Sequence, residues 1–406
     1  MPHISGGMET KMERVKTAII GLGQRGSSVL NQVLLGLDNC EITALCDVYD
    51  DLVEKYADLV EDKTGKRPFT TLDYQDILVR DDVEAVLVIT SWESHVKIAC
   101  DAMKAGKATG LEVGGAYDLD ECFELVQTYE ETRTPFMFLE NCCYGRYELM
   151  VLNMVKQGLF GEIVHCEGAY QHDLRDEILS GEKIRHYRLR NYIARNCENY
   201  PTHELGPIAR VLDINRGNRM LYLTSMSSKS VGLNEYASLH TDQYPEYLAT
   251  QKFNQGDVVT TNIMCSNGAT ISLMLDTCNA RPYSRNFTVH GTKGLYREDG
   301  NYVYLDSDFG PETHWNWKPH WDNGTEYLEK YEHPIWQKFI ADGLRGGHGG
   351  MDYLVYNDFF NYVINGGESP IDVYDAAAWM CITPLSALSI KEGSRPVEIP
   401  DFTVNR

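Results

Sequence analysis

A glycine-rich segment between an apolar strand and an amphipathic helix constrains the fold of this chain more than any other feature. The apolar run Val15–Ile20 leads directly into Gly21-Leu22-Gly23-Gln24-Arg25-Gly26, and a second apolar run ends at Asp47. Between them, apolar residues recur at helical spacing, at Val29, Leu30, Val33 and Leu34. A GxGxxG segment that follows a strand, opens a helix and precedes an acidic residue about 20 positions on predicts a Rossmann dinucleotide-binding domain.

Each residue of this segment has a physical task. Gly21 permits the tight turn, Gly23 lets the backbone approach a pyrophosphate, and Gly26 lets helix and strand pack closely. The helix N-terminus offers free N–H groups to the phosphates. Asp47 would accept hydrogen bonds from the adenosine ribose and repel a 2′-phosphate, which favours NAD over NADP. Arg25 leaves NADP open, because an arginine here could pair with that phosphate.

The strand–helix alternation continues to about residue 145. Buried strands are predicted at 83–90, 109–113 and 136–141, and a helix at 96–105 that Gly106 closes. Ligands of such sheets bind at the carboxyl ends of the strands, where Ser91-Trp92-Glu93-Ser94-His95 lies. We predict an α/β Rossmann domain over residues 1–145, to which C-terminal helices can return.

The second part, residues 146–406, has a different pattern of strands and helices. This pattern predicts an α+β domain for substrate binding and oligomerisation. Asn267-Gly268 is a hairpin signal between two strands. Helices are expected at 200–212, 353–364 and 375–392, and Pro384 should kink or split the last. We expect an open, mostly antiparallel sheet with one face against the Rossmann domain; its strands are predicted at 163–170, 221–227, 257–266, 270–276 and 285–290.

The charge and the cysteine content limit which binding partners and which cellular compartment are expected. The 406 residues are expected to form two domains, and their formal net charge of -22 disfavours nucleic acid and anionic membranes. Residues 1–16 lack the apolar core of a signal peptide, and no uninterrupted apolar run is long enough to span a bilayer. Eleven cysteines without CxxC pairs indicate reduced, buried thiols. We therefore expect a cytoplasmic protein.

Several longer motifs resemble one family of enzymes. Together with the domain order, they resemble the Gfo/Idh/MocA family of sugar and inositol oxidoreductases over nearly the whole chain. Within it they are most similar to glycoside hydrolase family 109, the NAD-dependent glycosidases described as α-N-acetylgalactosaminidases. The motifs are Trp92-Glu-Ser-His95, Leu111-Glu-Val113, Glu140-Asn-Cys-Cys-Tyr144, Gly168-Ala-Tyr-Gln-His-Asp173, Tyr200-Pro-Thr-His-Glu-Leu-Gly-Pro207, Arg281-Pro-Tyr-Ser284 and Gly346-Gly-His-Gly-Gly-Met-Asp352.

One position separates two branches of the resemblance. The sugar dehydrogenases usually carry Glu-Lys-Pro where this chain has Glu112-Val113-Gly114, and valine cannot move a proton. The glycosidase branch similarly lacks that lysine, although it often has Glu-Val-Pro and many of its members carry an export signal.

The resemblance implies a cycle with no net oxidation. NAD⁺ takes hydride from carbon 3 of a sugar, the ketone acidifies the hydrogen on carbon 2, a base removes it, the aglycone leaves, water adds, and the hydride returns. A ketone makes the neighbouring C–H removable by a side chain, so bases near carbons 2 and 3 are needed. The cofactor must also stay bound through the turnover.

The resemblance also assigns site residues. His203 is the leading catalytic candidate, because it titrates in the useful range and shares a helix face with Tyr200 three residues earlier. Tyr283 is the second, as a phenol that relays a proton or holds the ketone oxygen. The other sugar contacts are Tyr170, Arg188 and Tyr200. The residues implied to bind the cofactor are Gly21, Gly23 and Gly26, together with Gln24, Arg25, Asp47, Trp92, Ser94, His95, Glu112, Val113 and Asn141.

Alternatives stay open for several residues. Trp92 either stacks on the cofactor or packs the core, and His348 either touches substrate or sits at a glycine-rich turn. A metal at His203, Glu204 and Cys197 is the other reading of that region, but metal-ligand spacing is absent and no metal is predicted. The alternative functions are a net sugar dehydrogenase or glycoside 3-oxidase, and a cofactor-bound sensing or assembly protein. By resemblance we expect a homo-oligomer, a dimer or larger.

Overall fold

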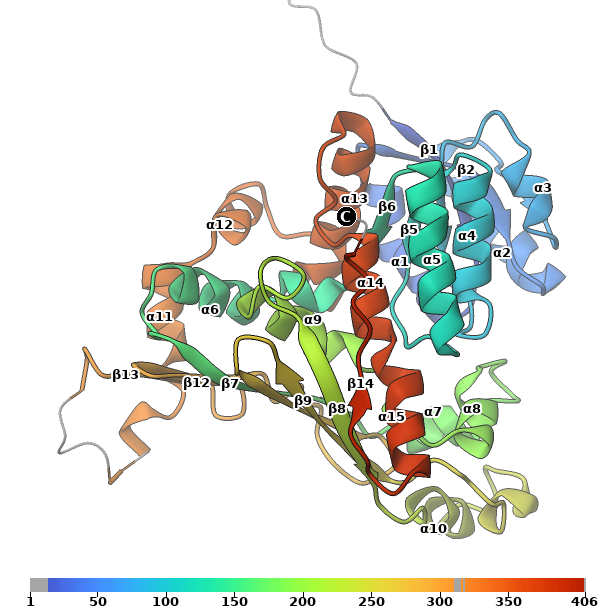
Figure 1. The fold of residues 1–406 in the computed structure, drawn as a ribbon. Coiled ribbons are helices and arrows are strands. Elements are labelled where there is room, and N and C mark those ends of the chain that lie inside the picture. Colours follow the sequence, from blue (N-terminus) through green and yellow to red (C-terminus); the bar gives the residue numbers. More distant parts are fainter. Residues whose placement is uncertain (1–13, 310–314, 317, 405–406) are drawn as a thin grey trace, which may run out of the picture.

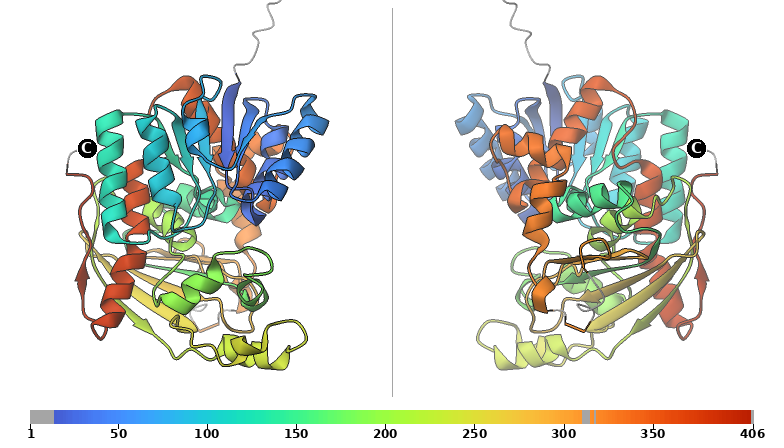
Figure 2. Two further views of the ribbon diagram at one scale, coloured as in Figure 1. Left: turned by 90° about the vertical axis from the view of Figure 1, so that its right-hand side faces the viewer. Right: turned by 90° about the vertical axis from the view of Figure 1, so that its left-hand side faces the viewer.

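The fold contains two sheets that lie one above the other with helices between them. A computed structural model describes residues 14–309, 315–316 and 318–404, so that most of the N-terminal segment discussed above lies outside the described residues. Figure 1 shows the smaller sheet in the upper part of the molecule and the larger one below it, and Figure 2 shows the same arrangement from both sides.

Within the described residues the upper sheet has six parallel strands, in the order β3-β2-β1-β4-β5-β6. The order reverses between β1 and β4, and this switch point is where a Rossmann sheet opens its ligand crevice. The predicted strands are confirmed with small shifts of their ends. The bounds are β1 Val15–Ile20, β2 Cys40–Cys46, β3 Phe69–Thr71, β4 Ala85–Val88, β5 Ala108–Leu111 and β6 Phe136–Phe138.

Helices cover both faces of this sheet. In Figure 1, α4 and α5 lie in front of it and α1 lies behind it. The helix predicted at 96–105 is α4, displaced by one residue. The bounds are α1 Gln24–Gln32, α2 Asp50–Thr64, α3 Gln75–Leu78, α4 His95–Lys104 and α5 Leu119–Thr132.

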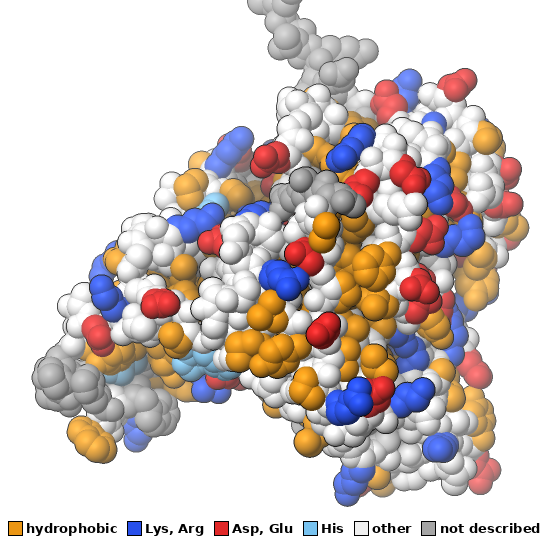
Figure 3. All heavy atoms as spheres, in the orientation of Figure 1, with side chains coloured by type: hydrophobic (Ala, Val, Ile, Leu, Met, Phe, Trp, Pro, Cys, Tyr) orange, Lys and Arg blue, Asp and Glu red, His pale blue; other side chains and the backbone are white. Residues whose placement is uncertain are grey.

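Two C-terminal helices return to the Rossmann sheet, as the sequence predicts. Helix α13, Met351–Asn365, packs against β1, and α14, Val373–Met380, packs against α5 and β6. Figure 3 shows hydrophobic side chains gathered on this side of the molecule along α5 and α14. The end of the chain therefore becomes part of the structure around the N-terminal sheet.

The lower sheet is open and mostly antiparallel, as predicted. Within the described residues its order is β13-β12-β11-β7-β10-β9-β8-β14, and β7 and β10 are the parallel neighbours in it. Sequence patterning missed its short strands β12, β13 and β14. The bounds are β7 Ile163–Gln171, β8 Met220–Ser227, β9 Val258–Cys265, β10 Thr270–Asp276, β11 Thr288–Gly291, β12 Gly294–Arg297, β13 Tyr302–Leu305 and β14 Val397–Glu398.

Two details of the predicted sheet are wrong. The strand predicted at 285–290 begins only at Thr288, because Asn286 has a left-handed backbone (φ 45°) that interrupts extended structure. The sheet also does not lie directly against the Rossmann domain. Helix α9, Thr202–Val211, packs on β7, and α15, Ile382–Lys391, packs on β8.

The last predicted helix, 375–392, is split as expected near Pro384. Helix α14 ends at Met380 and α15 starts at Ile382, so Pro384 falls in the first turn, where a missing N–H costs little. Among the described residues, one run, Val373–Lys391, is long and apolar enough to cross a membrane, which corrects our sequence reading. Because 78% of it is buried inside the protein, it fits a core helix.

The remaining elements connect these layers. The eleven cysteines, all within the described residues, are buried and unpaired, as predicted. The other α-helices are α6 Arg146–Lys156, α7 Arg175–Leu179, α8 Arg188–Ala194, α10 Gly232–Leu239, α11 Gly324–Tyr331 and α12 Pro334–Ala341. Short 3₁₀ turns occur at η1 Leu34–Gly36, η2 Asn141–Tyr144, η3 Glu246–Ala249, η5 Lys318–His320 and η6 His348–Gly350.

Candidate active site

The glycine-rich turn has the shape that a pyrophosphate requires. Gly21 has φ 102°, and a Cβ there would lie 2.3 Å from the Ile89 carbonyl oxygen. At Gly26 a Cβ would lie 2.0 Å from the Gly21 oxygen. At Gly23 a Cβ would meet nothing within 4 Å, so this backbone faces open space. Gly23 caps α1 without a side-chain hydrogen bond, which leaves the first N–H groups to a ligand.

Asp47 ends β2 beside this turn. Its Oδ2 accepts from the Leu22 N–H at 2.6 Å and its Oδ1 from the Tyr49 N–H at 3.0 Å. These bonds fix the carboxylate, and each oxygen keeps a lone pair for a ribose hydroxyl. The position fits the predicted role.

Arg25 is committed to acidic partners within the protein. Its Nε donates to Glu112 Oε1 at 2.9 Å, and its two terminal nitrogens donate to both oxygens of Asp352 at 2.8 and 3.0 Å. A guanidinium bound on both edges is a poor partner for a 2′-phosphate, so the NADP reading loses its support.

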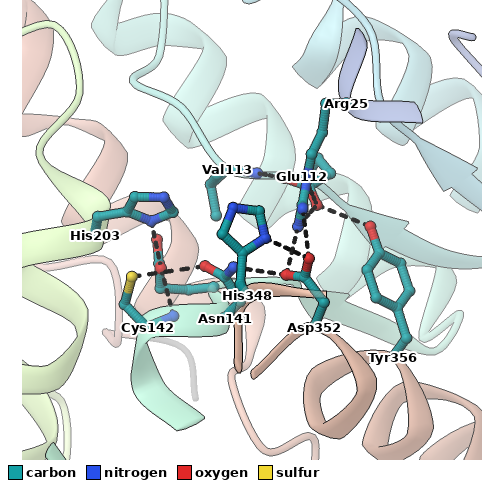
Figure 4. Close-up of polar contacts among 10 residues, drawn as sticks. Arg25, Glu112, Val113, Asn141, Cys142, His203, His348, Asp352 and Tyr356 are labelled. Carbon is teal, nitrogen blue, oxygen red and sulfur yellow. Dashed lines mark hydrogen bonds and ion pairs between the residues drawn. The ribbon is translucent and has the colours of Figure 1, made fainter. Parts of the chain in front are cut away.

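Four further groups complete this network, which Figure 4 shows between the glycine turn, the end of β5 and the start of α13. Tyr356 donates its hydroxyl to Glu112 Oε1 at 2.8 Å, and the Val113 N–H donates to the other oxygen at 3.0 Å. Asn141 donates to Asp352 Oδ1 at 2.7 Å, and His348 Nδ1 lies 2.6 Å from Asp352 Oδ2. Burial raises the pKa of Asp352, but hydrogen bonds from His348 and Arg25 outweigh burial and hold this pKa well below its usual range.

The loop after β4 contributes buried polar atoms that face the crevice region. Trp92 is 1% exposed, and its ring packs on Tyr187 with a centroid distance of 4.7 Å. Trp92 Nε1 has no hydrogen-bond partner among the described residues. Burial lowers the pKa of His95 to about 4, so its imidazole is neutral. Ser94 donates to Thr90 Oγ1 at 2.9 Å.

A pocket of about 270 Å³ lies where the two sheets' ligand-facing loops meet. Three residues predicted to hold the sugar or act in catalysis, Tyr170, His203 and Tyr283, line it. His348 also lines it, which favours the substrate reading of that residue over a remote turn. The other lining residues are Asn141, Cys142, His172 and Met351.

A buried carboxylate orients the leading catalytic candidate. His203 Nδ1 lies 2.6 Å from Glu140 Oε1, and the Glu140 side chain is fully buried. Burial raises the pKa of Glu140, but the charge and hydrogen bond of His203 outweigh this, and the pKa is lowered. Glu140 therefore stays ionised and accepts Nδ1–H, which leaves Nε2 of His203 as the free basic nitrogen.

Aromatic rings surround His203. Tyr200 meets it edge-on with centroids 4.9 Å apart. The two side chains are neighbours as expected, but the expected shared helix face is wrong, because Tyr200 lies two residues before α9 begins. Tyr170 lies 5.8 Å from His203 and 6.5 Å from Tyr283 between ring centroids. Burial raises the pKa of Tyr170, so its phenol keeps its proton at neutral pH.

Arg188 and Tyr200, both predicted sugar contacts, do not line the pocket. Arg188 is 5% exposed and lies 5.1 Å from the Tyr200 ring centroid and 5.9 Å from that of Tyr170. Its Nε is 2.9 Å from Glu177 Oε1. These two residues support the pocket wall from behind Tyr170.

The alternative metal reading is not supported by the geometry. The described residues bring Glu140 and Cys142, rather than Glu204 and Cys197, within 4.8 Å of His203. Glu140 is already hydrogen-bonded to His203. Burial raises the pKa of the Cys142 thiol, and the thiol lies 3.6 Å from Asn141 Oδ1.

Sequence reasoning missed Glu140, Asp352, Tyr356 and His172 as site residues. Glu140 could have been found, because it follows β6 at the carboxyl end of a parallel sheet. Asp352 and Tyr356 contact residues 327 and 244 positions away, and local patterns carry no such information.

The residues present fit a dinucleotide. The open space at Gly23 and the first turn of α1, whose N–H groups have no side-chain cap, leave room and hydrogen-bond donors for a pyrophosphate.

Comparison with known families agrees with this geometry. Residues 15–139 match the oxidoreductase family with an NAD-binding Rossmann fold, and residues 144–406 match the C-terminal domain of glycosyl hydrolase 109. An alpha-N-acetylgalactosaminidase of Tannerella forsythia is 37% identical over 96% of this chain and 86% of its own length. An alpha-N-acetylgalactosaminidase of Shewanella oneidensis is 38% identical over 98% of this chain and 87% of its own length.

Solved structures share the fold at low sequence identity. A levoglucosan dehydrogenase in complex with NADH and levoglucosan has a TM-score of 0.68 and 18% identity, covering 96% of this chain and 100% of that one. A scyllo-inositol dehydrogenase from Lactobacillus casei with bound NAD(H) and scyllo-inositol has a TM-score of 0.63 and 14% identity, covering 95% and 99%. With a glycosidase C-terminal domain behind an NAD-binding Rossmann domain, the chain belongs to glycosyl hydrolase family 109.

Proposed function

We propose that this enzyme hydrolyses N-acetylgalactosaminides through transient oxidation at carbon 3, elimination, water addition and re-reduction. The observation that carries the proposal is the Glu140–His203 pair at the pocket, 2.6 Å apart, in a chain with Val113 where the related dehydrogenases have their lysine. Such a pair supplies a base for the C–H bond at carbon 2, a step that a net dehydrogenase does not need. Because Val113 cannot take up the proton of the carbon 3 hydroxyl, that proton needs another acceptor.

His203 acts as the base at carbon 2. Its free Nε2 accepts the proton, and the ionised Glu140 stabilises the imidazolium that forms, as a buried carboxylate does in other His–carboxylate pairs. The pair is shielded, since the His203 side chain is 14% exposed. A weakly solvated carboxylate gains more from a neighbouring positive charge than an exposed one does.

The phenols lie at the sugar oxygen that becomes a carbonyl. As the carbon 3 hydrogen leaves as hydride, the hydroxyl proton passes through the phenol of Tyr283, which is half-exposed and can relay it to solvent. Tyr170 and Tyr283 line the same pocket as His203, and Tyr170 keeps its proton. A neutral phenol donates a hydrogen bond to a developing oxyanion. Arg188, 5.9 Å from the Tyr170 ring centroid, favours negative charge in this region.

The cofactor would be held by the glycine turn, Asp47 and the loop of Trp92, Ser94 and His95. When bound, NAD supplies reversible acceptance of the carbon 3 hydrogen. The Arg25, Glu112 and Asp352 network closes this end of the crevice, which suits a cofactor kept through many turnovers.

The substrate class rests on the relatives named alpha-N-acetylgalactosaminidase, at 37% and 38% identity. Nitrophenyl glycosides of both anomers, assayed in deuterium oxide on purified protein with and without NAD⁺, test the proposal. Release of nitrophenol with deuterium at carbon 2 and constant NADH is the expected result. NADH that grows with substrate would instead indicate a net sugar dehydrogenase, and no reaction across the panel would contradict catalysis on these glycosides.

A homo-oligomer in the cytoplasm is part of the same proposal. The face of the lower sheet turned away from α9 carries Tyr222 and Met226, exposed by 39% and 64%. Exposed apolar side chains on a flat sheet face favour pairing with a second copy. Light scattering of the purified chain would test this, and a monomer at micromolar concentration would contradict it.

A further inference from the structure

One segment of the C-terminal part crosses the edge of the Rossmann sheet at which a dinucleotide binds. This crossing segment, residues 184–195, lies between β7 and α9 and includes α8, which Figure 1 shows below the Rossmann domain. It contacts the Rossmann domain at three places, and each place follows the carboxyl end of a different parallel strand. These strands are β2, β4 and β5, so the contacts span both sides of the switch point between β1 and β4.

The first contact lies beyond β2, close to the carboxylate expected to hold the adenosine ribose. Arg185 Nη1 donates to Asp51 Oδ1 at 2.7 Å, and its guanidinium carbon lies 4.3 Å from the ring centroid of Tyr49. Asp51 is in the first turn of α2, four residues after Asp47. The left-handed backbone of Arg185 (φ 56°) is unfavourable for a residue with a Cβ, so tertiary contacts must hold it.

The second and third contacts lie on the other side of the switch point. Beyond β4, Arg190 donates to both oxygens of Glu93 at 2.7 and 3.0 Å, and the Asn191 amide donates to Glu93 Oε1 at 2.9 Å. Beyond β5, Arg195 donates to the Tyr117 carbonyl oxygen at 2.9 Å. A dinucleotide that extends across the switch point from the β2 side would therefore lie beneath the segment.

Apolar side chains at the β2 end of this crossing are exposed. Val48 and Leu72 follow the paired ends of β2 and β3, and they are 74% and 49% exposed. Ile184, which precedes Arg185, is 47% exposed. Exposed apolar surface beside a ribose-binding carboxylate, here Asp47, suits the adenine ring of a dinucleotide.

The ion pairs that hold the segment in place are weak enough to break and form again. The side chains of Arg185 and Asp51 are 41% and 65% exposed, and those of Arg190 and Glu93 are 57% and 28% exposed. Ion pairs with this exposure contribute little individually, and salt screens them. A segment held by such contacts opens for short times, as loops over active sites do.

We propose that residues 184–195 form a gate over bound NAD, which the pairs Arg185–Asp51 and Arg190–Glu93 hold closed and which must open before the cofactor enters or leaves. The gate sets the rates of cofactor exchange, and it keeps NAD bound while the enzyme turns over. It concerns the NAD site alone, so it stands whether or not the proposed glycosidase activity is found.

Exchange kinetics of Arg185→Gln, Arg190→Gln and the double variant test the gate. Protein loaded with NADH is mixed with excess NAD⁺, and the loss of bound NADH fluorescence gives the release rate. Release should be about two- to fivefold faster in each single variant and about tenfold faster in the double variant. Association should accelerate by a similar factor, because the pairs close the gate whether or not NAD is bound. The dissociation constant should therefore change less than about twofold.

Arg80→Gln is the matched control. Arg80 forms an equally close two-bond pair with Asp82, but at the opposite end of β4, so both rates should stay unchanged. Added salt should speed release from the wild type and not from the double variant. Unchanged release in the double variant would overturn the gate. Faster release with unchanged association would also overturn it, because the arginines would then bind the cofactor directly.

A cross-link between the two sides of the gate gives an independent measurement. The eleven natural cysteines are buried, so Arg185→Cys combined with Asp51→Cys provides two accessible thiols that a short dimaleimide can join. Protein joined after loading should retain NADH through gel filtration, and protein joined before loading should bind none. Exchange as fast in the joined protein as in the unjoined one would contradict the gate.

Discussion

At the scale of single residues, the charge of Glu140 is what makes His203 a base. Glu140→Gln keeps the size of the side chain but removes the negative charge behind the imidazole. We expect kcat to fall about 10²- to 10³-fold while NAD affinity stays within about twofold, because the change acts on proton transfer. Steady-state kinetics and NAD titration of the same preparation measure both.

Glu198→Gln is the matched control for that variant. Burial raises the pKa of Glu198, whose carboxyl hydrogen-bonds Glu204, so its charged form is disfavoured and an amide of the same size replaces it with little change in charge. Its activity should stay near that of the wild type. An equal loss in both variants would mean that Glu140 acts only through packing.

Asp352 gives a prediction on pH. Its pKa is lowered in the folded protein, so the stability it contributes is present above its unfolded value of about 3.9 and is lost as pH falls toward the folded value. Asp352→Asn should therefore lower the free energy of unfolding at pH 7, and its stability should depend less on pH below about 4. Denaturant unfolding at several pH values measures this; parallel pH curves for both proteins would contradict it.

The sequence predicts single residues well where one strand end determines their place. Asp47 and the three glycines lie as expected because the fingerprint is local. The Glu140–His203 and Arg25–Asp352 contacts span 63 and 327 positions, so only the folded chain brings them together. Arg188 and Tyr200 lie next to the residues that line the pocket, and their contact with the sugar stays a prediction.

At the scale of elements, two glycines of the turn before α1 have different tasks. Gly26 is needed for folding, and Gly23 is needed for cofactor binding. A methyl group at Gly26 would lie 2.0 Å from the Gly21 oxygen, whereas one at Gly23 meets nothing within 4 Å. Gly26→Ala should destabilise the protein by about 2–4 kcal/mol, because backbone atoms on both sides must move. Gly23→Ala should fold normally and lose NAD affinity at least about tenfold.

Thermal denaturation and NAD titration of the two variants distinguish these effects. If Gly23→Ala bound NAD as the wild type does, the glycine turn would not hold the pyrophosphate.

Element boundaries were predictable where apolar runs are long and uninterrupted. Strands β9 and β10 around Asn267-Gly268 fall within one residue of the expected bounds. The four-residue strands β12 and β13 carry too short a pattern to be distinguished from loop. Strand β11 was drawn too long because the left-handed Asn286 cannot be read from hydrophobicity.

At the scale of the whole molecule, α13 and α14 join the C-terminal part to the Rossmann sheet. We therefore expect one cooperative unfolding transition. NAD at 100 times its dissociation constant should stabilise the fold by about 2.7 kcal/mol and raise the Tm of that single transition. Calorimetry with and without NAD measures this. Two separate transitions, with only the first responding to NAD, would show that the halves unfold independently.

The position of Asp352 also sets an order of events during synthesis. The glycine turn emerges from the ribosome first, yet the carboxylate that binds Arg25 lies on a helix that begins at Met351. A nascent chain that has exposed only the Rossmann strands lacks this ion pair between Arg25 and Asp352. On the role proposed for this network, firm capture of the dinucleotide waits until translation has delivered nearly the entire polypeptide, so an enzyme loaded with its cofactor is also one whose synthesis is almost complete.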